Sequence, residues 1–166
     1  TFGEGPRWYA NKFYFSDFYS HKVYSLDLKG NYEVIVEVPN QPSGLGWMPD
    51  GTLLLVAMLS RRVLAVSPDG AVREHADLSG VATERCNDMV VSATGHAYVG
   101  NFGFDLEARK SFAPAFLAHI TPEGEVHKVD HPLAFPNGSV ITPDGSTLLV
   151  GETFGGRYTA FDLDEN

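Results

Sequence analysis

The sequence predicts an all-β fold, a β-propeller of four-stranded antiparallel blades, and two observations lead to this prediction. The first is a frame that occurs four times, in which a two-residue anchor is followed by a tight turn such as Pro-Asp-Gly; the anchors are Glu4-Gly5, Ser43-Gly44, Asn87-Asp88 and Asn137-Gly138. The second is period-two alternation of apolar residues between turn residues, with no segment of helical periodicity. Four strands per unit, repeated about every 40–50 residues, are typical of a propeller.

Each repeat predicts the same succession of strands. The anchor strand comes first, and a turn leads to an apolar second strand, expected at 13–15, 53–56, 97–99 and 148–150. A third strand follows a short polar or glycine-rich break, at 23–26, 63–66, 116–120 and 158–161. A hairpin turn then leads to a more polar fourth strand, as at 32–36 and 126–129. The third repeat also holds an insertion, residues 106–115, which we expect to project from one face of the propeller and shape the mouth of a site.

We expect residues 1–166 to form a single propeller domain, with blades that start near residues 4, 43, 87 and 137. The fourth repeat ends at Asn166, before the position of its outer strand. An open arc of blades would leave strand edges unpaired and half of its core uncovered. We therefore interpret the chain as the N-terminal part of a longer propeller with at least two further blades.

Composition and charge argue against several classes of partner. The 166 residues carry a formal net charge of −9, whereas a nucleic-acid surface needs clustered Lys and Arg. No apolar run approaches the roughly 20 residues of a membrane helix, so we expect neither nucleic acid nor a membrane as partner. Because Cys86 is the one cysteine, no intrachain disulfide is possible; this fits a reducing compartment, and we predict a cytoplasmic location. The sequence leaves the oligomeric state open.

The first residue of each anchor is a candidate for a shared site. The first strand of a propeller blade lines the central channel, so Glu4, Ser43, Asn87 and Asn137 should face a common axis. One carboxylate and two amide oxygens suit a hard divalent cation. Arg85, two residues before Asn87, is placed to present its guanidinium to an anionic or hydroxyl-rich substrate.

Each of these residues has an ordinary interpretation when taken alone. Glu4 lies near a chain end, where a solvated carboxylate is common, and Asn137 precedes a glycine, as turn residues often do. The shared position in the repeat favours a joint site. Tyr14, Tyr24, Trp8 and Trp47 are expected to be core aromatics between blades.

The motifs resemble those of a known family. Four stretches carry the resemblance: Gly3–Trp8, Arg85–Asp88, Gly100–Gly103 and Phe135–Gly138. They are similar to motifs of the gluconolactonase, senescence marker protein (regucalcin) and luciferin-regenerating enzyme family, whose members are six-bladed propellers. The resemblance implies that Glu4 and Asn137 are metal ligands, and that Arg85 and Asn87 orient the substrate, with Asn87 also near the metal. Asp105 aligns loosely with an acidic substrate-contacting residue.

The resemblance also implies the activity. We expect a metal-dependent hydrolase of lactones, with a sugar-acid lactone as substrate and Ca²⁺ as the first choice of cation; Zn²⁺, Mn²⁺ and Mg²⁺ are alternatives. The family's general base is an aspartate in a Pro-Asp-Gly motif one blade later, so we expect the catalytic base beyond residue 166. Two other functions stay open: an organophosphate-hydrolysing propeller, and a non-catalytic propeller that binds a ligand or partner and holds a structural cation.

Overall fold

The computed structural model describes residues 2–164, and these residues form fifteen strands and no helix. The first sheet contains β1 (Gly3–Tyr9), β2 (Lys12–Asp17), β3 (Lys22–Leu26) and β4 (Tyr32–Glu37). The second contains β5 (Pro42–Trp47), β6 (Leu53–Ala57), β7 (Arg62–Val66) and β8 (Val72–Asp77). The third contains β9 (Cys86–Val91), β10 (Ala97–Asn101), β11 (Ala118–Ile120) and β12 (Val126–Lys128), and the fourth contains β13 (Pro136–Ile141), β14 (Thr147–Glu152) and β15 (Arg157–Asp162).

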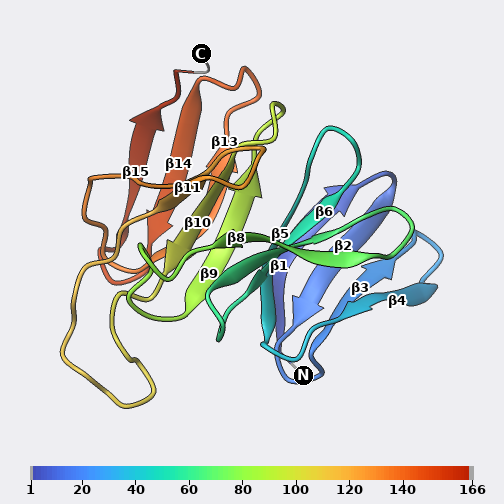
Figure 1. The fold of residues 1–166 in the computed structure, drawn as a ribbon, viewed down its shortest axis with the longest axis horizontal. Coiled ribbons are helices and arrows are strands. Elements are labelled where there is room, and N and C mark those ends of the chain that lie inside the picture. The colour runs from blue at the N-terminus through green and yellow to red at the C-terminus, as the bar shows by residue number, and fades with distance from the viewer. Residues whose placement is uncertain (1, 165–166) are drawn as a thin grey trace.

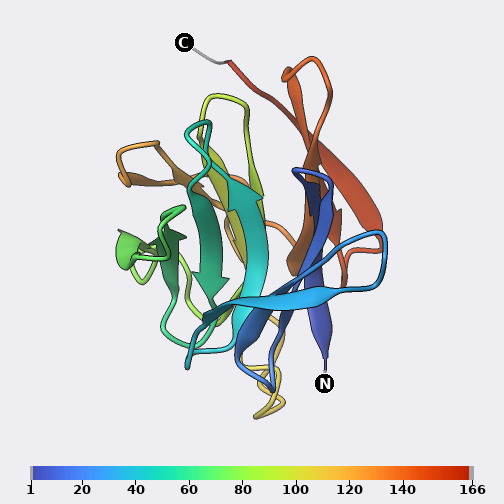
Figure 2. The same ribbon diagram turned by 90° about the vertical axis from the view of Figure 1, so that its right-hand side faces the viewer.

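The four sheets are successive blades of a β-propeller. Within each sheet the strands pair antiparallel in chain order, and the fourth sheet has three strands, β13-β14-β15. The first strand of each sheet contacts the first strand of the next, β1 with β5, β5 with β9 and β9 with β13. The sheets therefore follow one another as an arc around their first strands (Figures 1 and 2). The predicted all-β propeller class is confirmed.

The Pro-Asp-Gly segments at 49–51 and 143–145 are turns between the first and second strands, as the sequence predicts. Asp50 Oδ1 accepts a hydrogen bond from the backbone N–H of Thr52 at 2.9 Å, and Gly51 has a φ of 87°. Asp144 makes the same contact with Ser146 at 3.2 Å. An Asx contact followed by a glycine with positive φ is a common turn geometry. These aspartates therefore hold turns and are not site residues.

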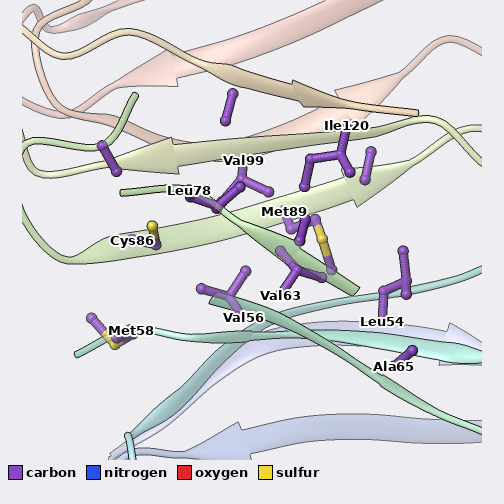
Figure 3. Packing of buried hydrophobic residues seen from close by; sticks show 14 residues of the cluster. Leu54, Val56, Met58, Val63, Ala65, Leu78, Cys86, Met89, Val99 and Ile120 are labelled. Atoms are coloured by element: carbon purple, nitrogen blue, oxygen red, sulfur yellow. The ribbon is translucent and has the colours of Figure 1, made fainter. Parts of the chain in front are cut away.

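Three apolar clusters lie between neighbouring sheets. The largest joins the second and third sheets, and Leu54, Val56, Met89 and Val99 are among its buried members (Figure 3). The other two clusters join the first sheet to the second and the third to the fourth. No helix among residues 2–164 is long and apolar enough to cross a membrane.

The expectation that all four named aromatics pack between blades is wrong for Trp8. Tyr14 and Trp47 do pack together between the first two sheets, with ring centroids 4.7 Å apart. Trp8 is 57% exposed. Its neighbours in β1 both reach the second sheet, Arg7 through Leu45 and Tyr9 through Trp47. Because side chains alternate along a strand, Trp8 has to face the other way.

Tyr24 also differs from the expectation. Its ring stacks on Phe15 at 5.3 Å, within the first sheet itself, and its edge meets Tyr32 at 6.3 Å. Phe15 and Tyr24 are directly paired across β2 and β3, so both side chains stand on one face of the sheet. Tyr14, one residue earlier, packs with Trp47 on the opposite face.

Candidate functional site

The site begins with an irregularity that all four first strands share. Each first strand carries one more residue than its partner strand opposite the anchor; the register shifts lie between Glu4 and Arg7, Pro42 and Leu45, Cys86 and Met89, and Pro136 and Ser139. Such β-bulges locally break the alternation of side chains and are frequent next to active sites. In the second, third and fourth sheets both anchor residues lie in the bulge, whereas in the first sheet Glu4 pairs with Ser16 and the bulge falls on Gly5 and Pro6.

Neighbouring anchors are in close contact. A Cβ on Gly5 would lie 2.7 Å from the carbonyl oxygen of Ser43, and a Cβ on Gly44 would overlap the backbone nitrogen of Met89. Only glycine allows a backbone approach of this kind. The repeat thus places the equivalent positions of successive sheets side by side, and glycine as the second anchor residue permits the contact.

Asn87 and Asn137, from the third and fourth sheets, meet directly. Asn87 Nδ2 donates a hydrogen bond of 3.0 Å to Oδ1 of Asn137. Asn87 is 5% exposed, and Asn137 is half-buried and donates a second hydrogen bond of 3.2 Å to Thr153 Oγ1. The two carboxamides that the sequence assigns to one site are therefore brought together and fixed in orientation.

Glu4 carries a half-buried carboxyl that interacts electrostatically with Asp88, the residue next to Asn87. Desolvation raises the pKa of its half-buried carboxyl, a hydrogen bond from the N–H of Gly5 opposes this shift, and the charge of Asp88 raises the pKa further. No Lys or Arg among the described residues forms an ion pair with Glu4. A partly desolvated carboxylate beside a second carboxylate is costly unless a cation compensates it.

Arg7 and Asp88 form an ion pair that was not among the expectations from the sequence. Nη2 of Arg7 lies 3.0 and 3.2 Å from the two carboxylate oxygens of Asp88 and also donates to the carbonyl of Met89. Its Nε donates to the carbonyl of Leu45 at 3.1 Å. The backbone N–H of Ser139 donates to Asp88 at 3.2 Å. This ion pair therefore links all four sheets around their anchors.

The signal for this ion pair was present in the repeat. Asp88 occupies the anchor position at which the other three repeats have glycine, Gly5, Gly44 and Gly138. A carboxylate at a position where two backbones approach needs a partner. Arg7, within the Gly3–Trp8 motif, supplies it.

Arg85 and Asp105 lie outside the group of Glu4, Asn87 and Asn137, which is called the anchor cluster below. Arg85 forms a bidentate ion pair with Glu107 of the insertion, at 2.7 and 2.5 Å. This contact raises the pKa of Arg85 and lowers the pKa of Glu107. Asp105 Oδ1 accepts a hydrogen bond of 2.9 Å from the N–H of Ala108 and so shapes the turn of the insertion. Arg85, Asp105 and Glu107 line one cavity, at the end of the molecule where the N-terminus and the insertion lie (Figures 1 and 2).

Cys86 precedes Asn87 and is closed off from chemistry. Its side chain is buried in the cluster between the second and third sheets, and burial raises the pKa of the thiol to about 12. A thiol with such a pKa stays protonated and is a poor nucleophile. Cys86 is therefore not a candidate nucleophile.

The anchor cluster fits a hard cation by the chemistry of its donors. Among residues 2–164 no three His, Cys, Asp or Glu side chains gather as a metal site. The expected set is different, one carboxylate and two carboxamides, and such oxygen donors suit Ca²⁺ or Mg²⁺. The absence of an ion pair at Glu4 among the described residues is consistent with a bound cation. Metal binding by Glu4, Asn87 and Asn137 stays a prediction.

Comparison with known proteins adds a family and a fold. A family model described as "SMP-30/Gluconolactonase/LRE-like region" matches residues 2–166. A gluconolactonase from Xanthomonas campestris superposes with a TM-score of 0.80 at 22% identity, over 99% of this chain and 59% of that one. A calcium-binding regucalcin from Agrobacterium tumefaciens superposes with a TM-score of 0.77 at 23% identity, over 98% and 54%.

A luciferin-regenerating enzyme superposes with a TM-score of 0.80 at 17% identity, over 98% of this chain and 56% of that one. At these identities the likeness to the three structures shows the propeller fold alone. The chain spans less than two thirds of the length of each of these proteins.

Proposed function

The chain belongs to the SMP-30/gluconolactonase/LRE-like family, and from this premise we propose that it serves a metal-dependent hydrolase of lactones, with a sugar-acid lactone as the leading substrate class. Two observations support the proposal: the contact between the carboxamides of Asn87 and Asn137, and the half-buried carboxyl of Glu4, which forms no ion pair among the described residues and interacts electrostatically with Asp88. Asn87 and Asn137 occupy equivalent bulge positions in the third and fourth sheets, and Glu4 directly precedes the bulge of the first sheet.

In this proposal Glu4, Asn87 and Asn137 hold a divalent cation, Ca²⁺ as the first choice and Zn²⁺, Mn²⁺ or Mg²⁺ as alternatives. A bound cation supplies Lewis-acid polarisation of the lactone carbonyl. The carboxylate of Glu4 provides negative charge, and the hydrogen bond from Asn87 to Asn137 keeps both carboxamides in a fixed orientation. The calcium-binding regucalcin among the similar structures supports calcium as the first cation to test.

The other residues bind and orient the substrate. Arg85 has five N–H donors, and its pair with Glu107 uses two of them, so donors remain for substrate hydroxyls. In the reaction water adds to the carbonyl carbon, the ring C–O bond breaks, and the departing oxygen takes a proton to give the hydroxy acid. Asp88 is unsuited as the general base for this step, because Arg7 neutralises its charge.

We keep the expected base, an aspartate in a Pro-Asp-Gly motif beyond residue 166, as part of the proposal. The proposed partner is a small lactone, and the proposed location is the cytoplasm. The uncompensated carboxyl of Glu4 favours metal-dependent chemistry. A divalent cation can polarise a phosphoryl oxygen as well as a lactone carbonyl. The assay therefore has to include both substrate types.

The test is hydrolysis of an aldonolactone and, in parallel, of a fluorophosphate by the full-length protein that carries the expected base, each with Ca²⁺ and after removal of divalent cations. We expect calcium-dependent lactone hydrolysis that Glu4→Gln reduces at least tenfold. Glu33→Gln is the matched control, because it also removes one carboxylate, from an exposed ion pair with Lys12. Turnover of the fluorophosphate alone would replace the lactonase proposal. Cation-independent hydrolysis, or hydrolysis unchanged in Glu4→Gln, would contradict it.

A further inference from the structure

A cavity of about 170 Å³ opens beside Arg85, where loops of the first three sheets meet. Six of its lining residues are apolar: Phe2, Phe18, Tyr19, Met58, Phe102 and Leu106. An apolar cavity of about 150 Å³ is known to hold a benzene molecule. The space beside Arg85 is therefore large enough for one aromatic ring or a short branched alkyl group.

Aromatic rings form one wall of this cavity. Phe2 stacks on Phe18 with ring centroids 5.2 Å apart, and the edge of Tyr19 meets Phe2 at 6.4 Å. Aromatic walls of this kind favour a flat, apolar guest. Phe102, another lining residue, is held against Phe135 at 4.5 Å. The wall thus continues into the packed interior near the fourth anchor strand.

The polar part of the lining consists of Gln41, Glu84, Arg85, Asp105 and Glu107, and the last three are engaged with other groups of the protein. Arg85 and Glu107 are paired with each other in a bidentate geometry, so their charges largely cancel. Asp105 is occupied with the N–H of Ala108. A guest that covers these groups therefore removes less solvation from them than it would from free charges.

The cavity is continuous with the anchor cluster along the chain. Phe2 precedes Glu4 by two residues, and Arg85 precedes Asn87 by two residues. The carbonyl of Arg85 accepts a hydrogen bond of 3.0 Å from Phe102, which fixes the strand start against the cavity wall. Arg85, which the proposed function assigns to substrate binding, lines this cavity, so a substrate held by Arg85 would have a substituent within reach of it.

A repeated feature of the loops points the same way. Tyr19, Leu59 and Phe154 each lie two residues after the end of the second strand of their sheets. Their exposed fractions are 67%, 44% and 54%. Phe154 packs against Phe104 and Phe135, with ring centroids 5.6 and 5.1 Å apart, whereas Tyr19 lines the cavity and meets the ring of Phe2. The three loop residues border the end of the propeller at which the cavity opens.

We propose that this cavity binds an aryl or short branched alkyl substituent of the substrate, so that a lactone with such a substituent binds more tightly than the same lactone without it. That the substrate is a lactone rests on the proposed function, whereas the cavity and its apolar lining residues are features of the structure. Binding and hydrolysis can therefore be measured separately.

The binding test uses lactams, because an amide analogue of a lactone resists hydrolysis. Titration calorimetry of the full chain compares 3,4-dihydroquinolin-2-one, which carries a fused aromatic ring, with piperidin-2-one, which lacks it. We expect the aryl lactam to bind at least tenfold more tightly. Tyr19→Ser and Leu106→Ser replace exposed lining residues and should each reduce this preference several-fold. Leu28→Ser, at a turn residue that is 84% exposed and outside the cavity, is the control.

Equal binding of the two lactams, or a preference that both lining variants retain, would overturn the inference. Parallel assays of hydrolysis on 3,4-dihydrocoumarin and on an aldonolactone separate it from the proposed function. Selective lactam binding without hydrolysis of either lactone would support the cavity and contradict the lactonase proposal. Hydrolysis of both lactones at equal efficiency, without lactam selectivity, would support the lactonase proposal and contradict the role of the cavity.

Discussion

Asn87 donates a hydrogen bond of 3.0 Å to Asn137 although 50 residues separate them in the chain. The two residues occupy the same position in successive repeats, so the contact is a consequence of propeller symmetry. It is also the most direct structural link between the sequence repeat and the proposed site.

Asn137→Ala should leave the buried carboxamide of Asn87 without its partner. An unsatisfied buried polar group costs about 1–3 kcal/mol, so we expect the free energy of unfolding to fall by about that amount, with weaker Ca²⁺ binding. Asn31→Ala is the control, since Asn31 also donates a side-chain hydrogen bond, to Asp27, but in an exposed turn. Urea unfolding of both variants measures the difference. Equal and small losses would show that the contact between Asn87 and Asn137 is not maintained.

Arg7→Met should destabilise the fold more than any loss of a surface ion pair. It leaves Asp88 largely buried, unpaired and close to Glu4. Breaking a buried ion pair from one side costs roughly 3–5 kcal/mol, whereas an exposed pair contributes about 0–1 kcal/mol. Lys12→Met, which breaks the exposed pair with Glu33, is the comparison. If the two variants unfold at the same urea concentration, the ion pair between Arg7 and Asp88 contributes no more to stability than the exposed pair between Lys12 and Glu33.

The repeat frame, the strand order and the three-stranded fourth sheet could be predicted, because turn residues and alternation are local properties. The contacts of the site could not. The bulges at the anchors interrupt the alternation, so the direction of Glu4 cannot be read from its place in a strand. The partner of Asp88 comes from another sheet, and the partner of Arg85 comes from an insertion without a repeat equivalent. Such contacts depend on how sheets pack.

Gly44→Ala should be strongly destabilising because a Cβ there would overlap the backbone of Met89 in the next sheet. Relief requires that the second and third sheets move apart at their anchors, so we expect a loss of more than about 2 kcal/mol. Gly80→Ala is the matched control, because a Cβ at Gly80 meets nothing within 4 Å. Thermal unfolding of both variants provides the comparison. A Gly44→Ala protein as stable as the control would contradict the close approach of the anchors.

The stability of the fourth sheet should depend on acid through Glu152. Hydrogen bonds from Arg157, Thr159 and the N–H of Ala134 to this buried carboxylate lower its pKa to about 2. The group binds protons more weakly when folded, so its contribution is complete above its unfolded pKa of about 4.5 and is lost as the pH falls towards 2. The contribution is at most about 3 kcal/mol.

The measurement is urea unfolding of the wild type and of Glu152→Gln at pH 7 and at pH 3. We expect the difference in the free energy of unfolding between the two proteins to be larger at pH 7. A difference that stays constant between the two pH values would show that Glu152 has an ordinary pKa in the folded chain.

Calorimetric titration of Ca²⁺ measures whether Glu4 shares one cation site with Asn87 and Asn137. We expect the wild type to bind one Ca²⁺ with a dissociation constant below about 1 mM. We also expect Glu4→Gln to weaken this binding at least tenfold, while Glu33→Gln binds like the wild type. Calcium binding that Glu4→Gln leaves unchanged, or no divalent binding tighter than about 1 mM, would contradict the shared site.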